Sequence, residues 1–361
     1  MKILKEFKHF VFRQYRRREI KKHELDYLFW ECTLRCNLNC LHCGSDCLKN
    51  SQIPDMPKED FFSVLDDISS SGLSRNLTIC ITGGEPLLRD DLLLVGRKIR
   101  EKGFKWGIVT NGLMLDRERF ISLLNAKMSS LSISLDGFEL QHNKLRCNSN
   151  SFSKAFEAVK TAVEFSQKGF LIFDVITCVS SLNFSSLEKF RDFLIDSGVK
   201  RWRIFSIFSS GRADKNLEFL SLSKTQYREL LDFISFTRKN FGNKISLNYS
   251  CEGFLDDYEL EVRDYFYFCR AGISVASVMC DGSLTGCLSV RAKDFIQGNI
   301  YEKSFSEIWK NGFSVMRDRR WAKKNKCQKC NFWQKCLGGG LHLYKSVDSE
   351  ISHCNLKDFL T

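Results

Sequence analysis

Three closely spaced cysteines stand first among the residues that could carry chemistry. Cys36, Cys40 and Cys43 follow an apolar run that ends near Thr33, with the spacing C-x3-C-x2-C. A loop that follows the carboxyl end of a buried strand is where parallel α/β folds place their active-site groups. Three thiolates in so short a loop can bind an iron–sulfur cluster or a zinc ion. Because structural zinc usually has four ligands, three cysteines favour a four-iron, four-sulfur cluster with one iron left open.

A second motif, Gly83–Gly84–Glu85–Pro86, ends the next strand-like run. Its two glycines allow the backbone to approach a ligand closely. Glu85 offers a carboxylate to an ammonium group, and Pro86 stiffens the turn. Such a stretch alone is common in turns, but its place on the strand after the cysteine loop makes it a specific signal.

A further group of cysteines lies in the loop-rich C-terminal part. Its members are Cys269, Cys287, Cys327, Cys330, Cys336 and Cys354. A C-x2-C pair with two more cysteines can make a closed zinc site with four thiolate ligands, and the same residues can also bind an iron–sulfur cluster.

Alternating strand-like and helix-like segments over residues 27–208 predict an α/β fold. The expected strands are residues 27–33, 77–84, 105–112, 129–137, 170–179 and 201–210. Helix start and stop signals surround the segments 56–72 and 151–169. Strands that alternate with helices in this way predict a parallel sheet with right-handed crossovers, either open or curled into a partial barrel.

Changes in composition divide the chain into four parts. We expect a basic amphipathic helix over residues 1–25, the barrel over 26–215, a connecting helix and linker over 216–264, and a smaller cysteine-rich domain over 265–361.

The net charge is +12, and half of it lies before Leu25. A basic amphipathic helix can contact a membrane, nucleic acid or an acidic substrate. Since charge runs usually mark solvated faces, we expect a cap helix packed on the domain, with no nucleic-acid partner and no membrane contact. The sequence has no secretory signal and no apolar run that could span a bilayer, which predicts a cytoplasmic protein.

The two N-terminal motifs together resemble the radical SAM superfamily. Cys36, Cys40 and Cys43 match its cluster triad, and Gly83–Pro86 match the stretch that holds the amino group of S-adenosylmethionine. The resemblance implies a partial (β/α)6 TIM-like barrel that binds a [4Fe-4S] cluster and S-adenosylmethionine.

Weaker parts of the resemblance concern other strand ends. "SISLDG" fits the stretch near the ribose, which places Ser134 and Asp136 there. "GRA" at residues 211–213 also recurs after the sixth strand of this group. His42 departs from the aromatic residue that many relatives have near the adenine, although a histidine can also stack.

The C-terminal cysteines resemble the SPASM extension, which binds auxiliary iron–sulfur clusters. The resemblance assigns an outer [4Fe-4S] cluster to Cys327, Cys330, Cys336 and Cys354. The inner cluster would use Cys269, Cys287 and a third cysteine, but Gly340 stands at that third position. Cys280 is a possible substitute, so the inner cluster has an open iron, is smaller or is absent.

The resemblance implies an enzyme that reductively cleaves S-adenosylmethionine to a 5′-deoxyadenosyl radical, which abstracts hydrogen from a substrate. We expect a peptide or protein side chain as the substrate and a flavodoxin or ferredoxin as the electron donor. The layout, with "LFWECTLRCNLNCLHCGSDC", also resembles a bacterial radical SAM/SPASM subgroup associated with a lipoprotein partner. Two alternatives stay open: a small-molecule cofactor precursor as substrate, such as a porphyrin, and a non-catalytic iron–sulfur or zinc protein. The GGEP stretch argues against the second.

Overall fold

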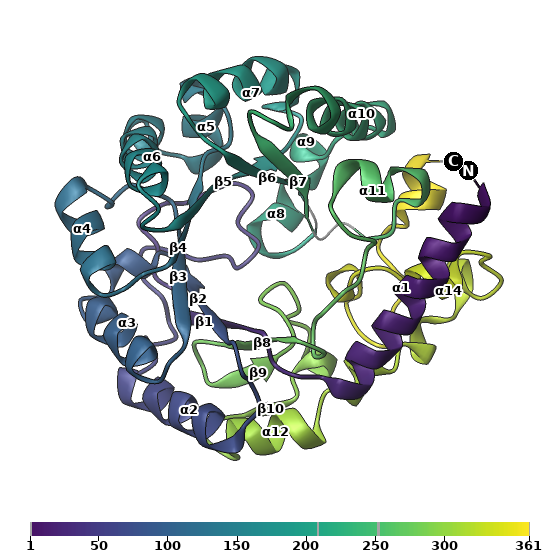
Figure 1. The fold of residues 1–361 in the computed structure, drawn as a ribbon, viewed down its shortest axis with the longest axis horizontal. Coiled ribbons are helices and arrows are strands. Elements are labelled where there is room, and N and C mark those ends of the chain that lie inside the picture. Colours follow the sequence, from purple (N-terminus) through teal and green to yellow (C-terminus); the bar gives the residue numbers. More distant parts are fainter. Residues whose placement is uncertain (1, 208, 251–252, 361) are drawn as a thin grey trace.

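The computed structural model describes residues 2–207, 209–250 and 253–360, and within these ranges ten strands form one curved sheet (Figure 1). In chain order the strands are β1 (Tyr27–Thr33), β2 (Thr78–Gly83), β3 (Lys105–Thr110), β4 (Ser130–Ser134), β5 (Ile172–Val179), β6 (Arg201–Ser206), β7 (Ser246–Tyr249), β8 (Val275–Val278), β9 (Ser283–Thr285) and β10 (Gly298–Asn299). Their order across the sheet is β10-β9-β8-β1-β2-β3-β4-β5-β6-β7.

After α1, which precedes β1, helices alternate with the parallel strands along the chain and lie around the sheet (Figure 1). They are α1 (Lys2–Lys22), α2 (Lys58–Ser71), α3 (Leu92–Glu101), α4 (Arg117–Asn125), α5 (Glu139–Arg146), α6 (Ser151–Gln167), α7 (Leu187–Asp196), α8 (Gly211–Lys215), α9 (Leu217–Leu220), α10 (Lys224–Phe241), α11 (Glu259–Val262), α12 (Phe305–Asn311), α13 (Ser314–Arg317) and α14 (Trp333–Cys336). None of the helices in the described ranges is both long enough and apolar enough to span a lipid bilayer.

Strands β1 to β7 pair in parallel, as the apolar runs predict. The mixed α/β barrel fold is therefore confirmed. The sheet is larger than the six expected strands, because β7 follows α10 and pairs with β6. At the other edge, β8 pairs in parallel with β1, and an antiparallel hairpin of β8 and β9 follows. The C-terminal part thus continues the sheet of the barrel.

Buried aromatic and aliphatic side chains join the sheet to its helices. Trp30 of β1 stacks on Phe61 of α2 with 4.0 Å between ring centroids, and both side chains are buried. Gly72 ends α2 in the left-handed conformation (φ 66°), where glycine avoids a steric penalty. Ser223 and Gln226 form a capping box at the start of α10. These capping residues set where α2 ends and where α10 begins.

Candidate active site

A cavity of about 310 Å³ lies at the carboxyl ends of the parallel strands. The three thiols of Cys36, Cys40 and Cys43 line it, and so do Gly83 and Gly84. The structure therefore brings the cysteine triad and the glycines of the second motif to one site. Residues at the ends of β3, β4, β5 and β6 complete the wall, which is where parallel α/β folds bind ligands.

The glycines of the GGEP motif are required by the cysteine loop itself. The Gly84 amide donates to the Thr33 carbonyl oxygen (2.8 Å), and the Glu85 amide donates to that of Arg35 (2.9 Å). A Cβ atom at Gly84 would overlap the Arg35 carbonyl oxygen and lie 3.2 Å from the Cys36 Cβ. Gly83 has a φ of 136°, which side chains rarely adopt. The two motifs thus form one packed unit, whereas the sequence indicated only a close approach to a ligand.

Glu85 lies behind the cavity wall, where its carboxylate accepts three hydrogen bonds. The donors are the Leu87 amide (3.1 Å), the Thr110 hydroxyl (2.7 Å) and the Asn111 amide (2.9 Å). Complete burial raises the pKa of Glu85, while these hydrogen bonds oppose the rise. The carboxylate therefore ties the turn to the end of β3. Its predicted contact with the amino group of S-adenosylmethionine stays a prediction.

Asn111 extends this connection to the cysteines. Its side-chain amide donates to Asn37 Oδ1 (2.8 Å) and lies 3.9 Å from Cys36 Sγ. Asn111 also lines the cavity. The sequence analysis did not single it out, although a polar residue directly after an apolar strand is a recognisable signal.

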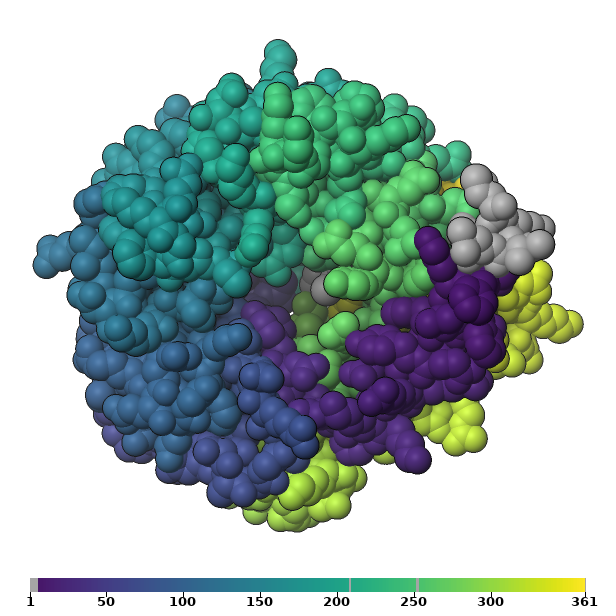
Figure 2. All heavy atoms as spheres, viewed as in Figure 1, coloured from purple at the N-terminus to yellow at the C-terminus, as the bar shows by residue number. Residues whose placement is uncertain are grey.

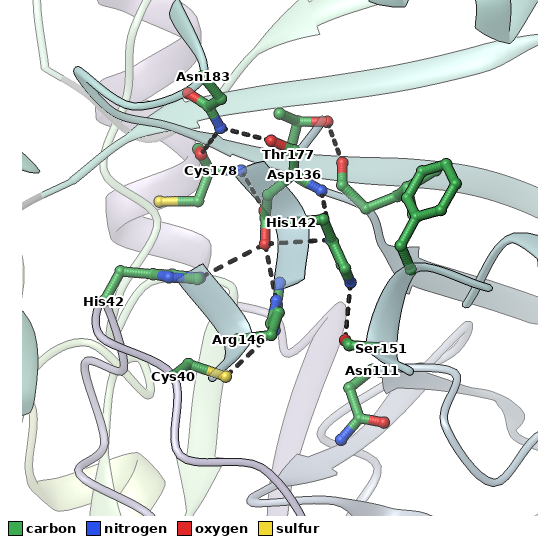
Figure 3. A network of polar contacts seen from close by, with 12 residues as sticks. Cys40, His42, Asn111, Asp136, His142, Arg146, Ser151, Thr177, Cys178 and Asn183 are labelled. Carbon is green, nitrogen blue, oxygen red and sulfur yellow. Dashed lines mark hydrogen bonds and ion pairs between the residues drawn. The ribbon is translucent and has the colours of Figure 1, made fainter. Parts of the chain in front are cut away.

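Asp136 is the centre of a buried polar network (Figure 3). Its carboxylate accepts a hydrogen bond from Arg146 Nε (2.7 Å) and another from the Cys178 amide (3.0 Å). Arg146 also donates to Cys40 Sγ at 3.7 Å. Burial raises the pKa of Asp136, but the neighbouring groups, Arg146 first among them, together hold this pKa below its usual value. The carboxylate thus has partners within the protein, and its predicted place near the ribose stays a prediction, as does that of Ser134 in the cavity wall.

Two neutral histidines flank Asp136 in this network (Figure 3). His142 Nδ1 accepts a hydrogen bond from the Asp136 amide (3.0 Å), and its Nε2 lies 2.9 Å from the Ser151 hydroxyl. His42 lines the cavity, with Nε2 3.7 Å from Asp136 Oδ2. Burial lowers the pKa of His42 to about 4 and that of His142 to about 3. Both rings are therefore uncharged at neutral pH.

Arg212, in the "GRA" stretch, fixes the backbone of the cysteine loop. Its guanidinium donates to the Cys40 carbonyl (2.9 Å) and the Cys47 carbonyl (2.9 Å), and pairs with Asp46 (2.6 Å). A Cβ atom at Gly211 would lie 2.6 Å from the Cys43 carbonyl oxygen. The stretch after β6 therefore closes over the loop that follows β1.

A fourth thiol, Cys47, lines the same cavity and was not among the predicted site residues. Its hydrogen bond to Cys43 is the largest cause of the lowered pKa of Cys43. Burial raises the pKa of Cys36 to about 12 and also raises that of Cys40. These two thiols are protonated at neutral pH, so they release protons when they bind a metal cluster.

The four cysteines assigned to the outer cluster, Cys327, Cys330, Cys336 and Cys354, also lie together. Burial raises the pKa of Cys336 to about 12, and the neighbouring thiols of Cys354 and Cys327 contribute. Cys330 and Cys354 likewise raise the pKa of Cys327. Since the four come from α14 and the loops beside it, the tertiary fold alone brings Cys354 to the other three.

The assignment of these cysteines to a cluster stays a prediction. Within the described ranges, no three His, Cys, Asp or Glu side chains are placed to hold one metal ion.

Cys269 and Cys287, the two cysteines assigned to the inner cluster, lie close to each other. Burial raises the pKa of Cys287, and Cys269 adds to the rise, so the two thiols are neighbours. A Cβ atom at Gly340 would overlap the His342 ring and lie 3.0 Å from the Tyr267 hydroxyl. The His342 imidazole therefore occupies the space that a side chain at position 340 would need.

Cys280 lies against the barrel. Its thiol donates to the Pro54 carbonyl oxygen (3.2 Å), and its amide to Glu31 of β1 (3.4 Å). Its position gives no support to Cys280 as a third ligand beside Cys269 and Cys287.

Comparison with known proteins decides the family. Residues 30–194 match the radical SAM superfamily, and residues 269–331 match the SPASM iron–sulfur cluster-binding domain. The chain belongs to the radical SAM superfamily, in its SPASM branch. It is a radical SAM enzyme. Membership implies a [4Fe-4S] cluster and S-adenosylmethionine in the barrel, and auxiliary iron–sulfur clusters in the SPASM domain.

Relatives of this radical SAM enzyme differ in what they act on. It is 27% identical over 338 residues to an AdoMet-dependent heme synthase of Methanosarcina barkeri, covering 88% of this chain and 92% of the relative. It is 24% identical over 322 residues to a PqqA peptide cyclase of Bradyrhizobium diazoefficiens, covering 86% of this chain and 79% of the relative. Its fold resembles that of Streptococcus suis SuiB bound to S-adenosylmethionine, with a TM-score of 0.69 and 19% identity over 92% and 78% of the two chains.

Proposed function

We propose that this radical SAM/SPASM enzyme abstracts a hydrogen atom from a side chain of a peptide or small protein. When bound, the cluster and S-adenosylmethionine supply the radical chemistry of the family. The residues of this chain hold the cluster loop and line the cavity that admits the substrate. The observation that carries the proposal is the neutral character of the cavity wall away from the cysteines.

That wall comes from two parts of the chain and is apolar or weakly polar. Its members are Phe205, Ser206, Ile207, Ser210, Leu288 and Ser289. The first two end β6 of the barrel, the next two follow it, and the last two follow the β8–β9 hairpin of the SPASM part. Hydroxyl and apolar groups suit the backbone and neutral side chains of a peptide, because none of them requires a charged partner.

Positive charge near the cavity already has partners in the protein. Among the described residues, Arg146 is the one lysine or arginine in the cavity wall, and its Nε binds Asp136. His42 is neutral because burial lowers its pKa to about 4. Arg291, near Ser45, pairs with the buried Glu31. A substrate with several carboxylates would have to bury these charges in the cavity without an unpaired cation beside them, and this desolvation would weaken its binding.

A tetrapyrrole substrate is the second candidate, and one observation favours it. The relative named as an AdoMet-dependent heme synthase covers 88% of this chain at 27% identity. The neutral wall argues against a polycarboxylate such as iron-coproporphyrin III, and for this reason we place the peptide first.

Anaerobic assays separate the two candidates. The enzyme is co-expressed with each short open reading frame beside its gene, and the peptide products are analysed by mass spectrometry. In parallel, the purified and reconstituted enzyme is incubated with iron-coproporphyrin III, dithionite and S-adenosylmethionine. We expect a mass change in one peptide that the Cys36→Ala variant does not produce, and no change in the porphyrin. Conversion of the porphyrin with no peptide modified would replace the proposal with the tetrapyrrole alternative.

A further inference from the structure

Helix α1 is fixed to the C-terminal part by one face. Arg16 Nη1 donates to the Lys335 carbonyl (2.9 Å), and Arg16 Nη2 donates to that of Gln334 (2.6 Å). The His9 ring lies 4.1 Å from the Phe266 ring, and both His9 and Arg16 are buried. These contacts set the rotation of the helix about its axis.

The opposite face of α1 exposes an apolar stripe. Phe7 is 62% exposed, Phe10 and Val11 are each 50% exposed, and Tyr15 is 40% exposed. Positions i, i+3, i+4 and i+8 lie on one face of a helix. Rotation of α1 to bury the stripe would break the hydrogen bonds of Arg16, so the stripe is a stable feature of the surface. In Figure 2, α1 lies across the face shown, in purple.

Positive charge surrounds this stripe. Lys8, Arg17, Arg18 and Lys21 are all exposed. The Arg13 guanidinium lies 5.9 Å from the centre of the Phe10 ring. From residue 6 to residue 22 there are seven basic and two acidic residues. One of the two acidic residues, Glu6, forms an ion pair with Lys335 of α14 at 2.7 Å, so its charge is already paired within the protein.

We propose that α1 binds the surface of an anionic lipid bilayer. Aromatic and aliphatic side chains beside lysines and arginines are the composition of helices that lie in the membrane interface. The cations are attracted to anionic headgroups, while the rings enter the boundary between headgroups and acyl chains. This contact replaces the solvated outer face that the sequence predicted. It is peripheral, and it does not depend on which substrate the enzyme modifies.

Vesicle sedimentation of the full-length reconstituted enzyme tests the proposal. One set of vesicles contains phosphatidylcholine alone, and the other contains phosphatidylcholine with phosphatidylglycerol. We expect binding to the anionic vesicles that weakens as salt increases, because exposed charges are screened. The Arg17→Gln/Arg18→Gln variant should lose affinity about fivefold for each charge removed. The Phe7→Ser/Phe10→Ser variant should lose binding at all salt concentrations.

Matched control variants outside α1 test whether these losses of binding are specific to α1. Phe170 and Phe236 are 61% and 54% exposed, so Phe170→Ser/Phe236→Ser removes similar apolar area elsewhere. Lys160 and Lys239 are exposed, so Lys160→Gln/Lys239→Gln removes equal charge elsewhere. Both controls should bind like the original chain, and thermal unfolding should be similar in all four variants.

Two results would overturn the proposal. One is equal sedimentation with neutral and anionic vesicles, or with neither. The other is a dimer in gel filtration that the Phe7→Ser/Phe10→Ser variant abolishes, because the stripe would then be an interface between two copies of this chain.

Discussion

Arg146 joins the Asp136 carboxylate to the Cys40 thiol, with Nε 2.7 Å from Oδ2 and Nη1 3.7 Å from Sγ. Asp136 follows β4, Arg146 ends α5 and Cys40 lies in the loop after β1, so the contact connects three separate parts of the barrel. A positive donor at a cluster thiolate stabilises the more negative, reduced state, since hydrogen bonds to the sulfurs set cluster potentials.

The Arg146→Met change should therefore lower the reduction potential of the SAM-binding cluster. If the equilibrium constant for one-electron reduction of the cluster falls roughly tenfold, the reduction potential falls by about 59 mV. Potentiometric titration followed by EPR measures the shift, and Arg146→Lys should restore part of it. The control is Arg203→Met, which breaks the ion pair of Arg203 with Asp174 (2.7 Å). An unchanged potential in Arg146→Met would contradict the prediction.

The Gly84→Ala change should displace the cysteine loop, because its Cβ would overlap the Arg35 carbonyl oxygen. We expect the variant to fold but to bind about four fewer irons per chain, the content of one cluster. Iron and sulfide analysis after anaerobic reconstitution checks this. Gly72→Ala is the control, since it replaces a glycine with positive φ and open space around it. It should lower the free energy of unfolding by about 1 kcal/mol and leave the iron content unchanged.

Cys36→Ala should abolish formation of 5′-deoxyadenosine with dithionite and S-adenosylmethionine. A cluster needs all three triad thiolates to hold it while one iron stays open. Cys32, four residues earlier, is fully buried in the hydrophobic core, so Cys32→Ala removes a thiol with no such role. Chromatography of the reaction products distinguishes the two variants. Cleavage by Cys36→Ala at the original rate would refute the assignment of the triad.

Cys330→Ala should remove the outer auxiliary cluster and spare the barrel. The expected change is a loss of about four irons with continued, uncoupled production of 5′-deoxyadenosine. Cys147→Ala serves as its comparison, because that exposed cysteine lies at the end of α5. Iron content equal in the two variants would mean that no cluster binds at the C-terminal set.

Gly340→Cys should fail to add iron by itself, because the His342 ring occupies the space of the new side chain. The double change Gly340→Cys/His342→Ala frees that space for the new thiol. If the inner site lacks only its third thiolate, the double variant should gain iron and the single variants should not. Mössbauer spectra of the three variants would show the added cluster. Iron gained by Gly340→Cys alone would contradict the steric argument.

The localisation in the cytoplasm, the electron donor and the lipoprotein-associated subgroup stay predictions. Each depends on a partner or a compartment, which neither the spacing of residues in this chain nor its fold determines.

Local sequence determined the parts of this protein that depend on neighbours along the chain. The β1 strand was predicted at residues 27–33 and is found there, and Gly72 ends α2 as expected. The spacing of Cys36, Cys40 and Cys43 indicated their ligand role, because a short loop brings its own thiols together whatever surrounds it.

Only the tertiary structure decided how distant residues complete the site. Asn111, Arg146 and Arg212 contact the cysteine loop from sequence separations of 74, 106 and 172 residues. It also turned Glu85 and Asp136 toward partners within the protein, and it fixed which face of α1 meets solvent. Such contacts depend on how strands align at the edge of a sheet and how helices pack, and these are set by the whole core and not by any short segment.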